Sequence, residues 1–109
     1  MNFNEYQKEA DSTAMYPNRG HNYIYPVIGL AGETGEVSEK FKKVIRDKNG
    51  VIDEETKKEI VKEMGDVLWY LSQICTELGV EFENVATANI EKLKSRKERG
   101  VVHGNGDNR

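Results

Sequence analysis

Two pairs of acidic residues with the same spacing are the residues of this chain best suited to chemistry. One pair is Glu33 and Glu36, and the other is Glu63 and Asp66, each with two residues between its members. Residues three apart lie on one side of a helix, so each pair points in one direction if its segment is helical. A glycine precedes the second acid of each pair, and its missing side chain leaves room for a ligand.

The chemistry of four such acids depends on whether the fold brings them together. Clustered carboxylates repel one another strongly unless cations lie among them. A ligand set made only of oxygen suits hard cations, so the pattern predicts Mg²⁺, with Mn²⁺ as a possible substitute. Because Mg²⁺ keeps several waters and is shared with substrate phosphates, we interpret Glu33, Glu36, Glu63 and Asp66 as metal ligands and catalytic residues of a phosphate-chemistry site with two or more ions.

Other metal sites fit the sequence poorly. Di-iron carboxylate bundles use Glu-x-x-His pairs, and neither His21 nor His103 has a glutamate three residues before it. The single cysteine, Cys75, and two distant histidines do not supply a zinc ligand set. One alternative stays open, in which the acids are ordinary solvated residues of a non-catalytic helical interaction module.

The elements that must position these acids are helices. Only two prolines occur, Pro17 and Pro26, so nothing after residue 27 forbids a helix on that ground. Apolar spacing, a capping Asp53 and a terminating Gly79 predict helices over about 3–15, 24–48, 53–78 and 82–98, with a tail over 99–109. In the fourth helix, Val85 and Leu93 are expected to face inward.

These four helices predict an all-α, antiparallel four-helix-bundle-like single domain over residues 1–109, with two long central helices. The first and fourth helices are too short to cover the other two along their length, which predicts a homodimer or homotetramer. Gly29, Gly32 and Gly35 weaken the second helix by about 1 kcal/mol each relative to alanine. We expect another backbone or a ligand to approach closely there.

Composition limits the partners of the chain. The net charge is −3 and no basic stripe is present, which argues against nucleic acid as a partner. No apolar run approaches the roughly 20 residues that span a bilayer, and the start of the chain does not resemble a signal peptide. We therefore expect a soluble, cytoplasmic protein with no membrane partner.

The two acidic segments, GLAGETGEVSEKFKK at residues 29–43 and KEMGDVLWYL at residues 62–71, resemble the MazG-like nucleotide pyrophosphohydrolases of the all-α NTP pyrophosphatase superfamily. The Glu-x-x-Glu and Glu-x-x-Asp motif of that family is met by Glu33, Glu36, Glu63 and Asp66. The resemblance implies Mg²⁺-dependent hydrolysis between the α and β phosphates of a nucleoside triphosphate, releasing a monophosphate and pyrophosphate. It also implies dimers or dimers of dimers whose sites borrow residues from a neighbour.

The same resemblance supplies candidate substrate residues. Asn89 and Lys92 would contact phosphate or sugar, and Arg96 lies on the same side of that helix. Tyr70 lies close to Glu63 around its helix, so it is a candidate to border the site and stack on a base. Arg109, in a glycine-rich tail, is a candidate phosphate ligand; the alternative is that the tail is a frayed end.

The implied mechanism uses metal ions to bind the triphosphate and acidify a water, with Glu33 taking the proton. A phosphoribosyl-ATP pyrophosphohydrolase, built on the same helical scaffold, is the second enzyme that the residues allow.

Overall fold

Four α-helices form all the regular secondary structure in the computed structural model, which describes residues 1–109. They are α1 (Phe3–Ser12), α2 (Ile24–Asp47), α3 (Glu54–Leu78) and α4 (Phe82–Glu98). No strand is present, so the predicted all-α class is confirmed. None of these helices combines the length and apolar character needed to cross a membrane.

Local signals set the ends of α3 as predicted. The side chain of Asp53 accepts a hydrogen bond from the amide N–H of Thr56 at 2.8 Å, so it satisfies one of the free donors at the start of α3. Gly79 ends the helix with a φ of 70°, in the left-handed region that glycine adopts without a steric penalty.

The first helix is shorter than predicted, because it ends at Ser12 and not at Met15. The hydroxyl of Thr13 donates to the carbonyl of Ala10 at 2.7 Å and accepts from the indole N–H of Trp69 at 2.9 Å. These bonds turn the chain out of the helix toward α3, which apolar periodicity alone does not reveal.

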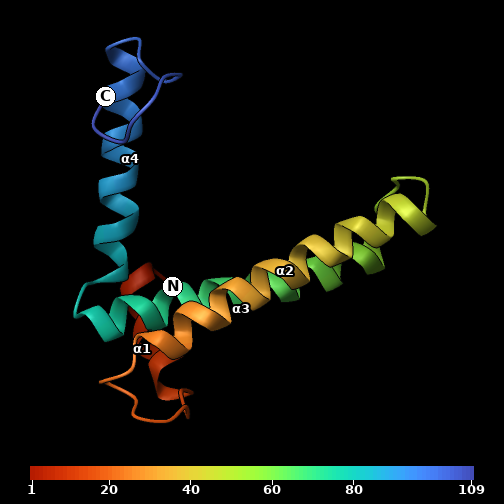
Figure 1. Cartoon of the computed structure of the whole chain (residues 1–109), viewed down its shortest axis with the longest axis horizontal. Coiled ribbons are helices and arrows are strands. Elements are labelled where there is room, and N and C mark those ends of the chain that lie inside the picture. The colour runs from red at the N-terminus through yellow and green to blue at the C-terminus, as the bar shows by residue number, and fades with distance from the viewer.

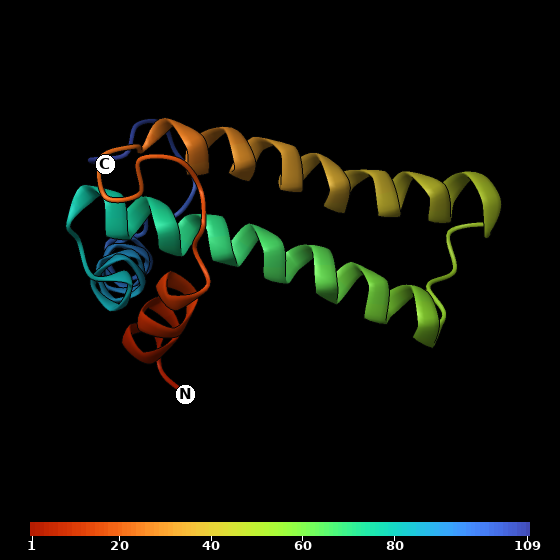
Figure 2. The ribbon, with the colours of Figure 1, turned by 90° about the horizontal axis from the view of Figure 1, so that it is seen from below.

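An antiparallel hairpin of α2 and α3 is the main body of the molecule (Figures 1 and 2). Helix α1 packs on α3 on the side away from α2 (Figure 2), and α4 projects sideways from the end of the hairpin (Figure 1). Helix α4 contacts α1 and α3 but not α2. The predicted four-helix bundle is therefore wrong for a single chain. Helices α2 and α3 pair along their length, α1 packs on α3 and on the start of α4, and α4 has no contact with α2.

The direction of α4 follows from how its first residue is held. The side-chain amide of Gln7 on α1 donates to the carbonyl of Val80 at 2.9 Å and accepts from the amide N–H of Phe82 at 2.8 Å. The Phe82 ring is buried against the edge of the Phe3 ring, with the ring centroids 5.0 Å apart. The start of α4 is thus fixed to α1, and the helix leads away from α2.

Much apolar surface is left uncovered by this arrangement. The accessible surface is 8030 Å², about 1,900 Å² more than expected for a compact monomer of this mass. The radius of gyration is 16.9 Å, against roughly 13 Å for a compact domain of this length. On α4, Val85 and Leu93 are 48% and 43% exposed, so the expectation that they face inward is wrong within one chain.

The close approach predicted at the glycines of α2 occurs at one of them. A Cβ atom on Gly29 would lie 2.1 Å from Cε1 of Tyr70, whose ring lies on the glycine backbone. Gly32 and Gly35 face open space. The Gly29–Tyr70 contact joins α2 and α3 one turn from Glu33 and Asp66.

Replacing Gly29 by alanine is therefore expected to lower the free energy of unfolding by roughly 1–3 kcal/mol, because the Tyr70 ring must move out of its place. Gly32→Ala is the matched control: it adds the same methyl group to the same helix in open space, and helix propensity favours it by up to about 1 kcal/mol. Urea denaturation measures both. Equal stabilities for the two variants would contradict the contact.

Candidate metal centre

Three of the four predicted acids come together on one edge of the hairpin. Carboxylate oxygens of Glu33 on α2 and of Glu63 and Asp66 on α3 all lie within 4.8 Å of one another. Glu33 and Glu63 are half-buried, and Asp66 is exposed. The register that produces this cluster is also seen in the ion pair of Lys40 with Glu59 at 3.5 Å, two turns farther along the hairpin.

Glu36 lies outside this group of three. Its side chain is exposed on α2, one turn after Glu33, with no hydrogen-bond or ion-pair partner. Its charge still acts on the cluster, because it is one of the charges that raise the pKa of Glu33. The spacing of the sequence places Glu36 on the correct side of α2, but only the structure shows that its carboxylate is not in the cluster itself.

The electrostatics of the cluster are those of uncompensated negative charge. Burial raises the pKa of Glu33, and the charges of Asp66, Glu63 and Glu36 raise it further. No lysine or arginine forms an ion pair with any of the four acids. An oxygen-only donor set from two helices, without a cation of its own, fits a hard divalent metal ion.

Aromatic side chains border the acids on the side of the α2 N-terminus. The Tyr70 ring packs edge-on against Trp69, with the ring centroids 5.0 Å apart. Burial raises the pKa of Tyr70, and the charges of Tyr25 and Glu33 raise it further. Tyr25 in turn stacks on Tyr16 at 4.8 Å. Tyr70 was predicted to border the site; the contribution of Tyr25 was not, because no spacing rule links it to Tyr70.

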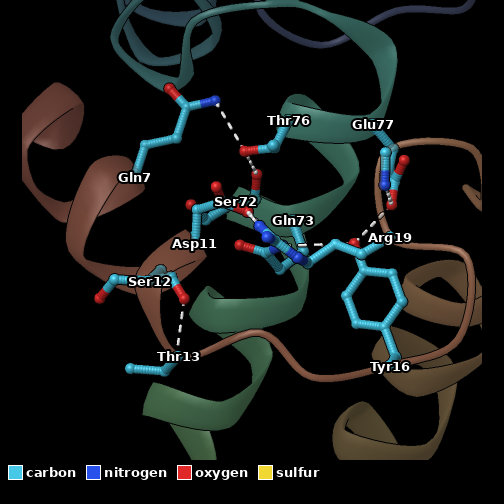
Figure 3. Close-up of polar contacts among 12 residues, drawn as sticks. Gln7, Asp11, Ser12, Thr13, Tyr16, Arg19, Ser72, Gln73, Thr76 and Glu77 are labelled. Carbon is cyan, nitrogen blue, oxygen red and sulfur yellow. Dashed lines mark hydrogen bonds and ion pairs between the residues drawn. The ribbon is translucent and has the colours of Figure 1, made fainter.

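A loop over residues 13–23 brings Tyr16 to this edge, and Glu77 of α3 holds that loop in place (Figure 3). The Glu77 carboxylate accepts from the Tyr16 hydroxyl at 2.6 Å, the Gly20 amide at 2.9 Å and the Asn22 amide at 3.3 Å. Burial raises the pKa of Glu77, but these hydrogen bonds together outweigh burial and lower it. This anchor was missed from the sequence, because Glu77 is separated from its partners by more than 50 residues.

Glu77→Gln is expected to lower the free energy of unfolding by roughly 1–3 kcal/mol at neutral pH, because a charged acceptor of three bonds becomes a neutral one. Since the folded-state pKa of Glu77 lies below its ordinary value of 4.5, its contribution is complete above that pH and is lost as the pH falls through the lowered pKa. Melting curves of both proteins between pH 3 and pH 8 should therefore converge at the acidic end (a range chosen to bracket the carboxyl pKa). A difference in melting temperature that stays constant over that range would contradict this anchor.

The predicted substrate residues of α4 are not brought to the acids within one chain. Asn89 is exposed, and α4 does not contact α2. Lys92 and Arg96 instead bind Asp107 of the tail, and Arg96 is buried. The ammonium of Lys92 and then the guanidinium of Arg96 hold the pKa of Asp107 below its usual range.

Arg109 is used inside the tail. Its guanidinium donates to the carbonyls of Val101 at 3.1 Å, Val102 at 2.8 Å and Gly106 at 2.6 Å. Its own carbonyl accepts from Arg99 at 2.8 Å. The tail is therefore a hydrogen-bonded loop closed against the end of α4, rather than a frayed end.

Comparison with known families agrees with this geometry. Residues 25–101 match the model of the MazG nucleotide pyrophosphohydrolase domain. The chain belongs to the MazG family. The matched MazG region contains α2, α3 and α4, and with them all four acids, whereas α1 and the tail after Val101 lie outside it. Enzymes with this MazG domain are nucleotide pyrophosphohydrolases and are generally dependent on divalent metal ions.

A relative of similar length is found in a bacteriophage. The Gene 37 protein of Mycobacterium phage L5 is 44% identical over 114 residues, and the alignment covers 100% of both chains. No solved structure shows a significant match. The acid cluster therefore lies inside the MazG region of an all-helical chain.

Proposed function

We propose that the protein is a Mg²⁺-dependent nucleoside triphosphate pyrophosphohydrolase, which converts an NTP or dNTP and water into the monophosphate and pyrophosphate and so clears nucleotides from the pool. The observation that carries the proposal is the uncompensated cluster of Glu33, Glu63 and Asp66 at the contact of α2 and α3, inside the MazG region. Such a cluster costs folding energy when no cation is bound, which favours a role in metal binding.

Each acid has a part in this proposal. Glu63 and Asp66 of α3 and Glu33 and Glu36 of α2 would hold the ions, with Glu36 completing the site from its exposed position one turn after Glu33. Bound Mg²⁺, or Mn²⁺ in its place, would neutralise the triphosphate and acidify the attacking water. Glu33 would take the proton of the attacking water, because it is the acid of α2 that lies next to both acids of α3.

Substrate contacts come from two places. Tyr70 lies one turn after Asp66 on α3 and would border the substrate, while one side of its ring is occupied by Gly29. Asn89, Lys92, Arg96 and Arg109 would bind phosphate or sugar from α4 and the tail. Since α4 does not reach α2 of its own chain, we assign this contact to a second copy of the protein.

A homodimer or homotetramer fits the uncovered surface. An open apolar groove runs along the hairpin, lined by Val37, Met64, Val67, Leu68 and Leu71. If each of two chains buried its excess of about 1,900 Å² relative to a compact monomer, the interface would total roughly 3,800 Å², which is in the range of obligate homodimers. Light scattering at micromolar concentration should give the mass of at least two chains; a monomer would remove the second copy from the site.

The experiment that tests the activity is release of pyrophosphate from a panel of ribo- and deoxyribonucleoside triphosphates, with Mg²⁺ and with EDTA. Phosphoribosyl-ATP belongs in the panel as the second enzyme substrate. We expect turnover of at least one triphosphate with Mg²⁺ and none with EDTA, with a monophosphate as the second product. Turnover of none of these compounds would favour the non-catalytic interaction module.

A further inference from the structure

Two cations one turn apart on α4 hold a single carboxylate from the tail. The ammonium of Lys92 lies 2.9 Å from Oδ1 of Asp107, and Nη2 of Arg96 lies 3.2 Å from the same oxygen. Nη2 of Arg96 also donates to the main-chain carbonyl of Asp107. Lys92 and Arg96 thus form a preformed site for an oxyanion, and the tail fills it.

The fit of Asp107 to this site is incomplete. The side chain of Arg96 is only 6% exposed, and its Nε has no hydrogen-bond acceptor. Both hydrogen bonds from its guanidinium to Asp107 are donated by Nη2. Asp107 therefore does not accept from Nε and Nη2 together, as a bidentate anion would. A phosphate group offers three oxygens and more negative charge, so it can accept from Nη2 of Arg96 and from Lys92 through separate oxygens, whereas Asp107 presents one carboxylate oxygen to both.

The tail is built so that Asp107 can leave without disturbing α4. The side chain of Asp107 is 78% exposed, so its pair with the partly exposed Lys92 contributes little to stability, whereas the buried Arg96 needs a replacement anion when Asp107 leaves. The other side-chain bonds that shape the tail join Arg109 to carbonyls of the tail itself and Arg99, at the end of α4, to the main-chain oxygen of Arg109. Release of Asp107 therefore breaks contacts at one point and leaves the tail loop closed on itself.

We propose that Asp107 is an internal competitor for Lys92 and Arg96, so that the tail must release these two cations before they bind the phosphate groups that the proposed function assigns to them. Polyphosphate is chosen because of the proposed function; the competition itself depends only on the geometry of α4 and the tail. The site accepts either the end of a nucleoside triphosphate or free pyrophosphate, since both present the same oxyanion.

Calorimetric titration with inorganic tripolyphosphate in EDTA tests the competition without any hydrolysis. Because EDTA removes divalent metal ions, the acid cluster repels the polyanion. Binding of tripolyphosphate therefore measures its contact with the cations of α4. Asp107→Asn is expected to bind tripolyphosphate roughly three- to tenfold more tightly than the wild type, because a competing charged acceptor is removed. Lys92→Gln, an exposed change that leaves Arg96 in place, is expected to weaken binding in the Asp107→Asn background. Parallel titrations with pyrophosphate and with ATP show which source binds more tightly.

Glu98→Gln is the matched control, because it removes one negative charge from α4 at a residue that pairs with neither cation. Equal gains in affinity for Asp107→Asn and Glu98→Gln would show a general charge effect and overturn the proposal. Absence of binding to Asp107→Asn would overturn it as well. A failed nucleotide assay alone would leave these titrations unaffected, so the two proposals fail separately.

Discussion

Glu33→Gln and Asp66→Asn are each expected to lower kcat by roughly 10²- to 10⁴-fold, the range found when a general base or a group stabilising the transition state is removed. Both substitutions keep the size of the side chain and remove only its charge. The carboxylates of these two residues and Glu63 lie within 4.8 Å of one another. Replacing one of them by its amide therefore removes a metal ligand and leaves the packing of the helices unchanged. Pyrophosphate release at saturating substrate measures the effect.

Glu39→Gln is the matched control for these variants. Glu39 lies on α2, one turn beyond Glu36, and pairs with Lys42 at 2.9 Å. The substitution therefore removes the same charge from the same helix, but outside the site. Its kcat should stay within about twofold of the wild type, since exposed ion pairs contribute little. Near-normal turnover of Glu33→Gln or Asp66→Asn, with unchanged helical content by circular dichroism, would sink the assignment of the acids.

Glu36→Gln separates two versions of the site. If Glu36 completes the metal centre, its loss should lower kcat by orders of magnitude like the loss of the other acids. If this variant alone keeps full activity, the working site is the group of three acids that the folded chain already brings together.

Added Mg²⁺ is expected to raise the melting temperature of the wild type by roughly 10 °C at a hundredfold excess over Kd, which corresponds to about 2.7 kcal/mol. The reason lies in the acid cluster. Glu33 has a raised pKa in the folded state, so at neutral pH its ionised form destabilises the fold relative to the unfolded chain, and this penalty disappears as the pH falls through the raised pKa. A cation that binds only the folded form removes the same repulsion at neutral pH.

The variant Asp66→Asn gives the opposite result to most substitutions. Without metal it should be as stable as the wild type or more stable, because one repelling charge next to Glu33 is gone. With Mg²⁺ its melting temperature should rise less than that of the wild type, because a ligand is missing. Melting curves in EDTA, in Mg²⁺ and in NaCl of matched ionic strength measure both effects. Equal shifts of the wild type in Mg²⁺ and NaCl would show simple screening and no metal site in the free protein.

The sequence by itself determined that the chain is helical and which two acids share one side of each long helix. Asp53 begins α3 and Gly79 ends it, as their cap chemistry requires. The spacing of three residues placed Glu63 and Asp66 on one side of this helix. These features depend on interactions between residues a few positions apart, where the geometry of one helix is already known. That is why the acid pairs, the family and the helical class could be predicted.

The tertiary structure decided which groups from different helices meet. It joined Glu33 to Glu63 and Asp66 while leaving Glu36 outside, and it placed the Tyr70 ring on Gly29. These outcomes depend on the register and rotation of α2 against α3, which vary with the packing of whole side chains and not with spacing along either helix.

The direction of α4 and the state of its cations were also decided only by tertiary contacts. Gln7 fixes the first residue of α4 from 75 positions away, and Asp107 occupies Lys92 from 15 positions away. Hydrogen bonds over such separations form only after the chain has reversed direction, so no periodic pattern records them. The sequence therefore determined which residues can do the chemistry, and the packing of α1 and the tail decided that α4 would carry its cations away from the acids of its own chain.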